Sequence, residues 1–295
     1  MSDTTRPAIV LITADELIRE AIGCYGNAAV PTPNLDRLAQ RGTRFDRAYS
    51  SSPWCLPARW SLLSGKLPHA SGAYSNFRPV TTDPESPNLY RTVRDHGYTA
   101  AHIGKCHYYP VPYGETRADR TLPYDSFRDS YLRLGIDHLD LQDDKQVSVW
   151  FYDDYAKELD AAGYLGAYRD ATWQRLENGR VFPFPGPDEW HPDSWVGRKA
   201  VDYINGYRSD QGLFLWASFS GPHYPIDPPA AYLDRVDMSR DLERVVVPGE
   251  FDDPARLHYR SFNGPGGIDG CAGAPEGACR NYTDDYWVSF RRHYY

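Results

Sequence analysis

One short segment of the sequence carries a cysteine and an arginine at a spacing that suits chemistry on an anion. Residues 50–66 read SSSPWCLPARWSLLSGK, with Cys55 just before a predicted helix and Arg59 four positions further along. Free backbone N–H groups at the start of a helix favour an anionic ligand or a developing oxyanion. Cys55 and Arg59 are therefore candidates for a nucleophile and an anion-binding cation.

A plain thiol is a weak explanation for Cys55. Cysteine phosphatases place five residues between their cysteine and arginine, so that the loop wraps around the phosphate. Only three residues separate Cys55 from Arg59. The segment therefore indicates a nucleophile whose chemistry differs from that of an ordinary cysteine.

Further reactive side chains follow the predicted strands. In an open α/β sheet, ligands bind beyond the carboxyl ends of the strands, so polar residues that gather there are candidates for one shared site. Each residue alone has a common structural explanation, such as a helix cap or a hydrogen-bonded core histidine, but their joint occurrence favours a site. They are Asp15 and Glu16 after the first strand, Cys55 after the second, Lys105 and His107 after the third, and His223 after the fourth.

The elements that must position these side chains alternate between strands and helices. A continuous β-branched run predicts a strand at 8–13, buried on both faces of a parallel sheet, and a partly alternating pattern predicts a second strand at 44–50. Further strands are predicted at 98–104 and 212–220. Cap residues and apolar stripes predict helices at 32–42, 57–65, 88–97 and 194–207. This order predicts an α/β fold with a mainly parallel sheet. We interpret the acidic and aromatic residues 137–160 as a surface subdomain or lid, and residues 248–285 as a long loop.

Composition narrows the class of protein. The 295 residues are 41% hydrophobic and carry a net charge of −8, with no concentrated basic patch, which argues against nucleic acid or an anionic membrane as partner. The N-terminal apolar run is too short for a signal sequence or a membrane span, so we expect a cytoplasmic enzyme. Irregular spacing of the five cysteines argues against a zinc site or a disulfide framework, although Cys271 and Cys279 could pair in an oxidising compartment.

Several motifs together resemble the type I sulfatases, the formylglycine-dependent arylsulfatase family of the alkaline phosphatase-like superfamily. The segment CLPAR resembles the CxPxR signature, in which the cysteine is oxidised to formylglycine. Similar elements surround it in the expected order: IVLITADELIREAIGCYGN, TPNLDRLAQRGTRFDRAY, GYTAAHIGKCHYYP and FLWASFSGPHYPIDPP. The resemblance implies an α/β/α sandwich, and it implies a formylglycine-generating enzyme as partner and a small sulfate ester as substrate.

The resemblance also implies a role for each candidate residue. Cys55, once converted, would present an aldehyde hydrate that attacks sulfur. Asp15, Glu16 and the modified Cys55 would bind a divalent metal, with Ca²⁺ expected and Mg²⁺ or Mn²⁺ as alternatives. Arg59 would offset the charge of the nucleophile. Lys105 and His223 would bind sulfate oxygens and protonate the leaving alkoxide, and His107 would orient or deprotonate the diol.

The sequence departs from the family in three places. Family members usually have Asp or Gln where this chain has Glu16, and Trp where it has Cys106, which we interpret as a small packing residue. Members also carry a later strand with two more metal ligands, which we do not find here. We therefore expect the N-terminal portion of a longer protein, or a partner chain or oligomer that completes the site. The predicted domains are a catalytic domain at 1–230, with an insertion at about 111–192, and a loop-rich extension at 231–295.

Three functions remain open from the sequence. The first is a sulfuric ester hydrolase. The second is a phosphonate or phosphate ester hydrolase, because tetrahedral oxyanions are bound by similar cationic sites. The third is a catalytically incomplete chain whose metal site is half built.

Overall fold

The chain divides into two compact units. The computed structural model describes residues 6–78, 80, 83–110, 125–145, 151–178, 181–240, 249, 252–255 and 283–295. The first unit consists of Met1–Glu16, Arg47–Leu165 and Pro192–His223, and the second of Leu17–Asp46, Gly166–His191 and Tyr224–Tyr295. Cys271 and Cys279, and most of the predicted loop at 248–285, lie outside the described residues. The boundary that we predict near residue 230 stays a prediction.

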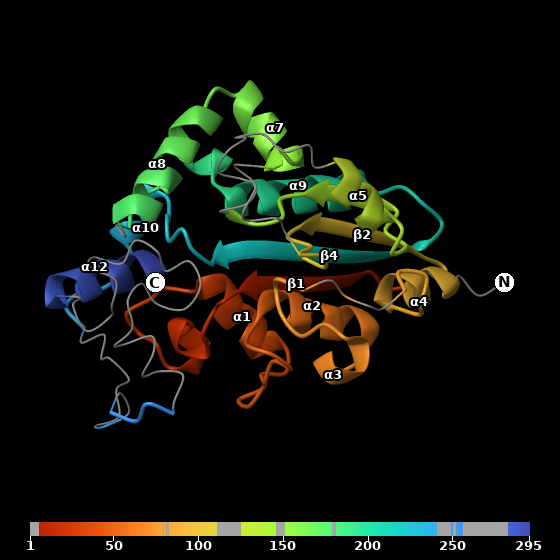
Figure 1. Ribbon diagram of the computed structural model, residues 1–295, viewed down its shortest axis with the longest axis horizontal. Coiled ribbons are helices and arrows are strands. Elements are labelled where there is room, and N and C mark those ends of the chain that lie inside the picture. Colours follow the sequence, from red (N-terminus) through yellow and green to blue (C-terminus); the bar gives the residue numbers. More distant parts are fainter. Residues whose placement is uncertain are drawn as a thin grey trace. The chain divides into compact units, whose positions relative to one another are not determined.

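A parallel sheet forms the centre of the first unit (Figure 1). Its described strands are β1 (Ile9–Asp15), β2 (Tyr98–Gly104), β3 (His138–Leu141) and β4 (Gly212–Pro222), in the spatial order β1-β4-β2-β3. β4 is buried along almost its whole length because it pairs in parallel with both β1 and β2. The prediction of an α/β fold with a mainly parallel sheet is therefore confirmed.

Helices cover both faces of this sheet. Figure 1 shows α9 (Pro192–Gly206) and α2 (Cys55–Ser64) on opposite sides of the strands. The remaining described helices of this unit are α3 (Pro68–Ser71), α4 (Leu89–Asp95), α5 (Asp125–Leu132) and α7 (Asp154–Ala161). Trp60 of α2, Tyr90 of α4 and Trp216 of β4 meet in one buried apolar core, which holds α2 against the sheet.

Glycines fix the chain at the end of α2 and at the end of β2. Gly65 takes φ 68° and ends α2, a left-handed conformation that glycine adopts without strain. Gly104 ends β2 with φ 102°, and a Cβ atom there would lie 2.0 Å from the carbonyl oxygen of Ser218 on β4. The chain can therefore turn from β2 into Lys105 only because residue 104 has no side chain.

Two of the predicted strands differ from the structure. Residues 44–50 form no strand, and Phe45 and Tyr49 are exposed, so pairing would bury little apolar surface. β3 takes a place in the sheet instead, and the interpretation of 137–160 as a surface subdomain or lid is wrong for His138–Leu141. The first predicted strand forms as β1, but it lies at the edge of the described sheet, and Ile12 is 61% exposed, so the prediction of a strand buried on both faces is wrong.

The second unit is mainly helical in its described part. Thr32 precedes α1 (Pro33–Arg41), as predicted, and its hydroxyl accepts a hydrogen bond from the backbone N–H of Gly23. The other described helical elements are η1 (Arg19–Ala21), η2 (Gly23–Tyr25), most of α8 (Leu165–Asn178), η3 (Asp188–Trp190), α10 (Ala230–Leu233) and α12 (Asp284–Tyr294). Throughout the described chain, each helix is too short or too polar to cross a membrane.

Candidate functional site

The predicted site residues of the first unit meet where the strands end. Asp15 is the last residue of β1, Lys105 and His107 follow β2, and His223 follows β4. Cys55 is the first residue of α2, where the helix dipole favours negative charge. The backbone N–H groups that follow it are already used, because Leu56 donates to Oδ1 of Asn76 and Ala58 donates to the backbone oxygen of Trp54. The rule that polar residues gather beyond the carboxyl ends of parallel strands therefore holds for Asp15, Lys105, His107 and His223. It was wrong for Cys55, because the strand expected at 44–50 does not form and α2 positions this residue.

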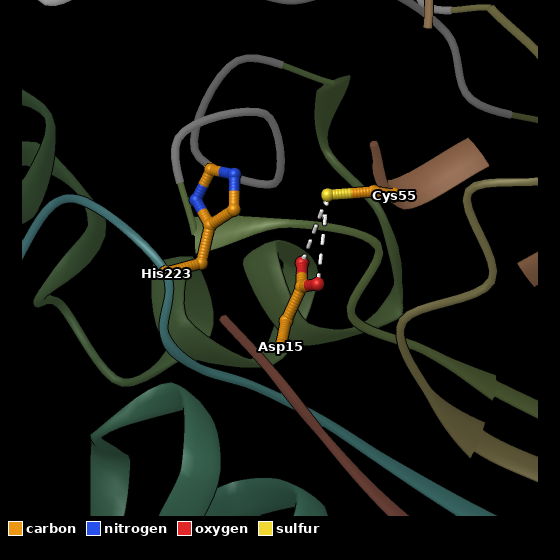
Figure 2. Close-up of side chains that lie close together, drawn as sticks. All are labelled: Asp15, Cys55 and His223. Carbon is orange, nitrogen blue, oxygen red and sulfur yellow. Dashed lines mark hydrogen bonds between the residues drawn. The ribbon is translucent and has the colours of Figure 1, made fainter. Parts of the chain in front are cut away.

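Asp15, Cys55 and His223 form the centre of this cluster. The Cys55 sulfur lies 3.5 Å and 3.4 Å from the two carboxylate oxygens of Asp15. One potential ligand atom from each of the three residues lies within 4.8 Å of the other two. Figure 2 shows the three side chains converging from β1, from the start of α2 and from the segment after β4. Such an arrangement could hold a metal ion.

Lys105 joins the cluster from β2. Its Nζ atom lies 2.5 Å from Oδ2 of Asp15 and 2.6 Å from Oδ2 of Asp144, and the side chain is fully buried. Burial alone would lower the pKa of Lys105, but the charges of Asp144 and Asp15 outweigh it and raise the pKa well above its usual value. Lys105 is therefore a permanent buried cation. Two of its three ammonium donors are used in these contacts, which leaves one for an anion.

Arg59 ties the helix to the sheet beneath the cysteine. Its Nη1 atom donates to the backbone oxygen of Lys105 at 2.7 Å and to Oγ of Ser218 at 2.8 Å, and Nη2 lies 3.9 Å from Asp15. The guanidinium is buried, so its charge acts in an environment of low dielectric constant. Arg59 thus fixes the position of α2 and adds a second cation beside Asp15.

His107 is buried without the contacts that such a side chain normally has. It is 2% exposed, and neither ring nitrogen makes a hydrogen bond of ordinary geometry with any described residue. Its backbone takes φ 45°, a left-handed conformation that is uncommon for a residue other than glycine. The imidazole interacts with the Cys55 side chain, whose pKa it helps to lower, so His107 belongs to the same cluster as the candidate nucleophile.

The cations and histidines change the protonation of the acidic groups. Burial would raise the pKa of Asp15, but Lys105, Arg59 and His223 together hold it well below its usual range. Burial likewise opposes ionisation of Cys55, but the charge of Lys105 and the nearby imidazoles of His107 and His223 lower its pKa to about 6. The site therefore stabilises negative charge at position 55.

His223 has the opposite shift. Burial would lower its pKa, but the carboxylate of Asp144 and, more weakly, Cys55 and Glu16 raise it to about 9. Its Nε2 atom lies 3.8 Å from Asp144 and 3.6 Å from Glu16. His223 is therefore a protonated imidazolium at neutral pH, in a position to donate a proton or bind an anion.

Glu16 and Cys106 differ in how far they enter the site. Glu16 is half exposed, takes φ 63°, and is not one of the three residues that share the potential metal site. A metal-binding role for Glu16 remains a prediction. Cys106 is fully buried in the apolar core, which confirms its interpretation as a packing residue.

Two acidic residues of the site were missed by the sequence analysis. Asp143 and Asp144 follow β3 and are buried beside Lys105 and His107. The sequence did contain a signal for them: Leu139 and Leu141 alternate with polar residues, as in a short strand, and Asp143 and Asp144 follow soon after. We assigned that segment to a surface insertion, so the rule on strand ends was not applied to it.

Comparison with known proteins is consistent with this geometry. The sequence model of the Sulfatase family matches residues 7–245. The chain is 28% identical to an arylsulfatase of Clostridium perfringens over 243 residues, which cover 78% of this chain and 46% of that protein. It is 27% identical to the uncharacterized sulfatase YidJ of Escherichia coli over 285 residues, 95% of this chain and 52% of that protein. The chain therefore spans about half the length of these relatives.

Solved structures share the fold. The phosphonate monoester hydrolase of Agrobacterium radiobacter superposes with a TM-score of 0.70 at 20% identity, over 98% of this chain and 56% of that chain. A putative sulfatase from Bacteroides thetaiotaomicron gives a TM-score of 0.56 at 20% identity, over 98% and 51% of the two chains. At these identities the likeness supports the alkaline phosphatase-like fold and not a particular substrate.

Proposed function

Since this chain belongs to the Sulfatase family, we propose that the protein hydrolyses a sulfate monoester to an alcohol and inorganic sulfate. The observation that carries the proposal is the position of Cys55 at the start of α2, beside the buried cations Arg59 and Lys105. Those cations suit the sulfate group, because each can bind an oxygen of a tetrahedral anion.

The nucleophile in this proposal is Cys55 after oxidation to formylglycine by a formylglycine-generating enzyme. When hydrated, the aldehyde supplies one hydroxyl that attacks sulfur and displaces the alkoxide, which takes up a proton. Deprotonation of the second hydroxyl then re-forms the aldehyde and breaks the C–O bond to the sulfate, which leaves as inorganic sulfate. A site that lowers the pKa of the Cys55 thiol would also favour the ionised form of a hydroxyl at the same position. Arg59 would offset the charge of that group, and Lys105 would hold a sulfate oxygen through its third ammonium donor.

The two histidines have separate roles in this scheme. The imidazole of His107 interacts with Cys55, so a ring nitrogen can accept a proton from the nucleophile. His223 is protonated at neutral pH, because its pKa is about 9, and it can donate a proton to the leaving alkoxide. Proton removal and proton delivery would thus be performed by two different residues.

The donor set around Asp15 fits a divalent cation after the modification. Asp15 supplies carboxylate oxygens, which calcium and magnesium prefer, and formylglycine would replace the sulfur of Cys55 by oxygen. A bound cation would polarise the sulfate and lower the pKa of the nucleophile. Calcium takes six to eight oxygen ligands. We therefore propose Glu16 as a further ligand, and Asp15, Glu16 and the modified Cys55 would supply only part of such a shell.

A phosphonate or phosphate ester hydrolase is the second candidate. The cationic groups of the site recognise a tetrahedral oxyanion whether its centre is sulfur or phosphorus. The superposition on a phosphonate monoester hydrolase, with a TM-score of 0.70, makes this candidate worth testing, although it supports the fold alone.

Mass spectrometry and paired assays test the proposal. The purified protein, co-expressed with a formylglycine-generating enzyme, should contain a Cys55 peptide that is lighter by about 18 Da, since CH₂–SH becomes CHO. The same preparation should hydrolyse an aryl sulfate faster than the matching aryl phosphonate. Turnover with an unmodified thiol would contradict the nucleophile, and a preference for the phosphonate would favour the second candidate.

A further inference from the structure

The loop that carries Lys105 and His107 has an unfavourable backbone conformation that needs support. His107 takes φ 45°, where its Cβ atom crowds the backbone, and such a conformation persists only when its surroundings hold it. This residue also carries the imidazole that interacts with Cys55. Whatever stabilises the turn therefore also sets the direction of a side chain that the reaction needs.

One carboxylate accepts both backbone N–H groups of the turn. Oδ1 of Asp143 lies 2.9 Å from the nitrogen of Cys106 and 2.7 Å from the nitrogen of His107. Successive N–H groups in such a turn form a concave site for an anion, and here the anion is a side chain of the protein itself. Hydrogen bonds to an ionised carboxylate are stronger than those between neutral groups, so they can offset the strain at His107.

Asp143 is itself held in place. Its other oxygen, Oδ2, accepts a hydrogen bond from the hydroxyl of Tyr131 at 3.1 Å, and its backbone nitrogen donates to Oδ2 of Asp153 at 3.0 Å. Oδ1 of Asp153 caps the start of α7 by accepting from Ala156. Asp143, Tyr131 and Asp153 are all buried, so the carboxylate has little freedom to move.

The loop is also held from its other side. The backbone oxygen of Lys105 accepts from Nη1 of Arg59 at 2.7 Å, and the ring of His102 lies 3.1 Å from the same oxygen. The carbonyl side of the turn is thus fixed from α2 and β2, and the amide side from the end of β3.

We propose that Asp143 is a positioning residue, which holds Cys106 and His107 in the turn and so keeps Lys105 and His107 directed at Cys55. It acts through the backbone of the loop, whereas its neighbour Asp144 contacts the Lys105 ammonium directly. The proposal rests on the sulfatase function insofar as it predicts an effect on turnover. The structural part, that Asp143 maintains the turn, does not depend on the substrate.

Variants of Asp143 and one matched control test the proposal in the purified, formylglycine-containing protein. Asp143→Ala removes both hydrogen bonds to the turn, and we expect kcat to fall about 10²-fold with a smaller change in KM, the size expected for a displaced catalytic group. Asp143→Asn keeps a carbonyl oxygen for the two N–H groups and should restore most of kcat. Asp137→Ala is the control, because Oδ2 of Asp137 accepts from the N–H of Ala100 near the opposite end of β2.

Hydrogen exchange gives a readout that does not require turnover. In Asp143→Ala the N–H groups of Cys106 and His107 should exchange at least tenfold faster than in the protein without this substitution. The same groups should stay protected in Asp143→Asn, and their exchange rates should be unchanged in Asp137→Ala. If the protein lacks sulfatase activity, the proposed function fails, while the exchange rates still decide whether Asp143 holds the turn.

Two results would overturn the positioning role. One is unchanged protection of Cys106 and His107 in Asp143→Ala. The other is a fall in kcat no larger than that of Asp137→Ala at equal folded fraction. If Asp143→Ala does not fold, Tyr131→Phe takes its place, because this variant removes one hydrogen bond from the Asp143 carboxylate. It should change kcat and the exchange rates in the same direction by a smaller amount. Unchanged kcat and exchange rates in Tyr131→Phe would count against the proposal.

Discussion

Two buried histidines lie five residues apart at the end of β2, and their surroundings differ completely. His102 lies in an aromatic cluster, where Nδ1 is 2.6 Å from the hydroxyl of Tyr90 and Nε2 is 3.1 Å from the oxygen of Lys105. His107 is as deeply buried, but its ring makes no hydrogen bond of ordinary geometry with a described residue, and its interaction is with the Cys55 side chain. The first imidazole is thus held by structural partners, whereas the second faces the candidate nucleophile.

The ionisable groups around His102 and those of the candidate site also differ in their charge. Burial and the charge of Arg59 lower the pKa of His102 to about 3, so its ring is neutral. In the cluster of Asp15, Lys105, Asp144 and His223, burial opposes every charge, yet opposite charges keep the groups ionised. Burial alone therefore does not distinguish a structural polar group from a functional one, whereas the partners do.

The two cysteines of this region should give the largest difference. We expect Cys55→Ala to lower turnover by at least about 10³-fold, because it removes the proposed nucleophile. Cys106→Ala, which alters only a core contact, should lower it less than about tenfold. Steady-state hydrolysis of an aryl sulfate measures both, and equal losses would show that the cysteines are misassigned.

The two histidines should separate activity from stability. His107→Ala should reduce kcat by about 10²- to 10⁴-fold, the usual contribution of a general base. Its free energy of unfolding should fall by less than that of His102→Ala, since both variants leave a cavity but only His102→Ala also removes the hydrogen bond to the Tyr90 hydroxyl. His102→Ala should do the reverse, costing about 2–4 kcal/mol of stability through a cavity and an unpaired Tyr90 hydroxyl, with a smaller effect on kcat.

Chemical denaturation and assays of both variants would check this. An activity loss in His102→Ala that exceeds that of His107→Ala at equal folded fraction would remove the distinction between the two environments.

The smallest expected effect is on the pH dependence of stability. His223 has a folded pKa of about 9, above the unfolded value, so its stabilising contribution is complete below about pH 6.5 and is lost as the pH rises through 9. His102 has a folded pKa of about 3, below the unfolded value, so its contribution is complete above pH 6.5 and is lost as the pH falls towards 3. Each limb amounts to a few kcal/mol at most.

Urea denaturation of the unmodified chain with a chelator present, at pH 4.5, 6.5 and 8.5, measures the two limbs. His223→Gln should flatten the alkaline limb, and His102→Gln the acidic one. Unchanged slopes in both variants would mean that other groups control the pH dependence.

Long strands, and the residues that follow them, could be predicted from the sequence better than short strands. β2 and β4 have seven and eleven residues, and their apolar runs are clear, so Lys105, His107 and His223 could be placed at one sheet edge. β3 has only four residues inside an acidic segment, and its pairing with β2 depends on contacts that the local pattern does not encode. Asp143 and Asp144 were missed together with that strand.

Two other differences have the same origin. The apolar pattern of β1 was read as a strand buried on both faces, yet its exposure depends on which strands lie beside it. Residues 44–50 have a partly alternating pattern but no neighbour to pair with among the described strands. Sequence periodicity indicates what a segment can form, and tertiary contacts decide whether it does so.

The unpaired edge of β1 affects the tendency of this polypeptide to aggregate. Within the described sheet, β4 pairs with only one side of β1, and Ile9, Val10 and Ile12 on this strand are 41–61% exposed. An unpaired, apolar edge is a template for intermolecular β-pairing. In concentrated solution, molecules of this 295-residue polypeptide should therefore associate through β1. Because β1 ends in Asp15, such aggregation would distort the candidate site before it unfolded the core.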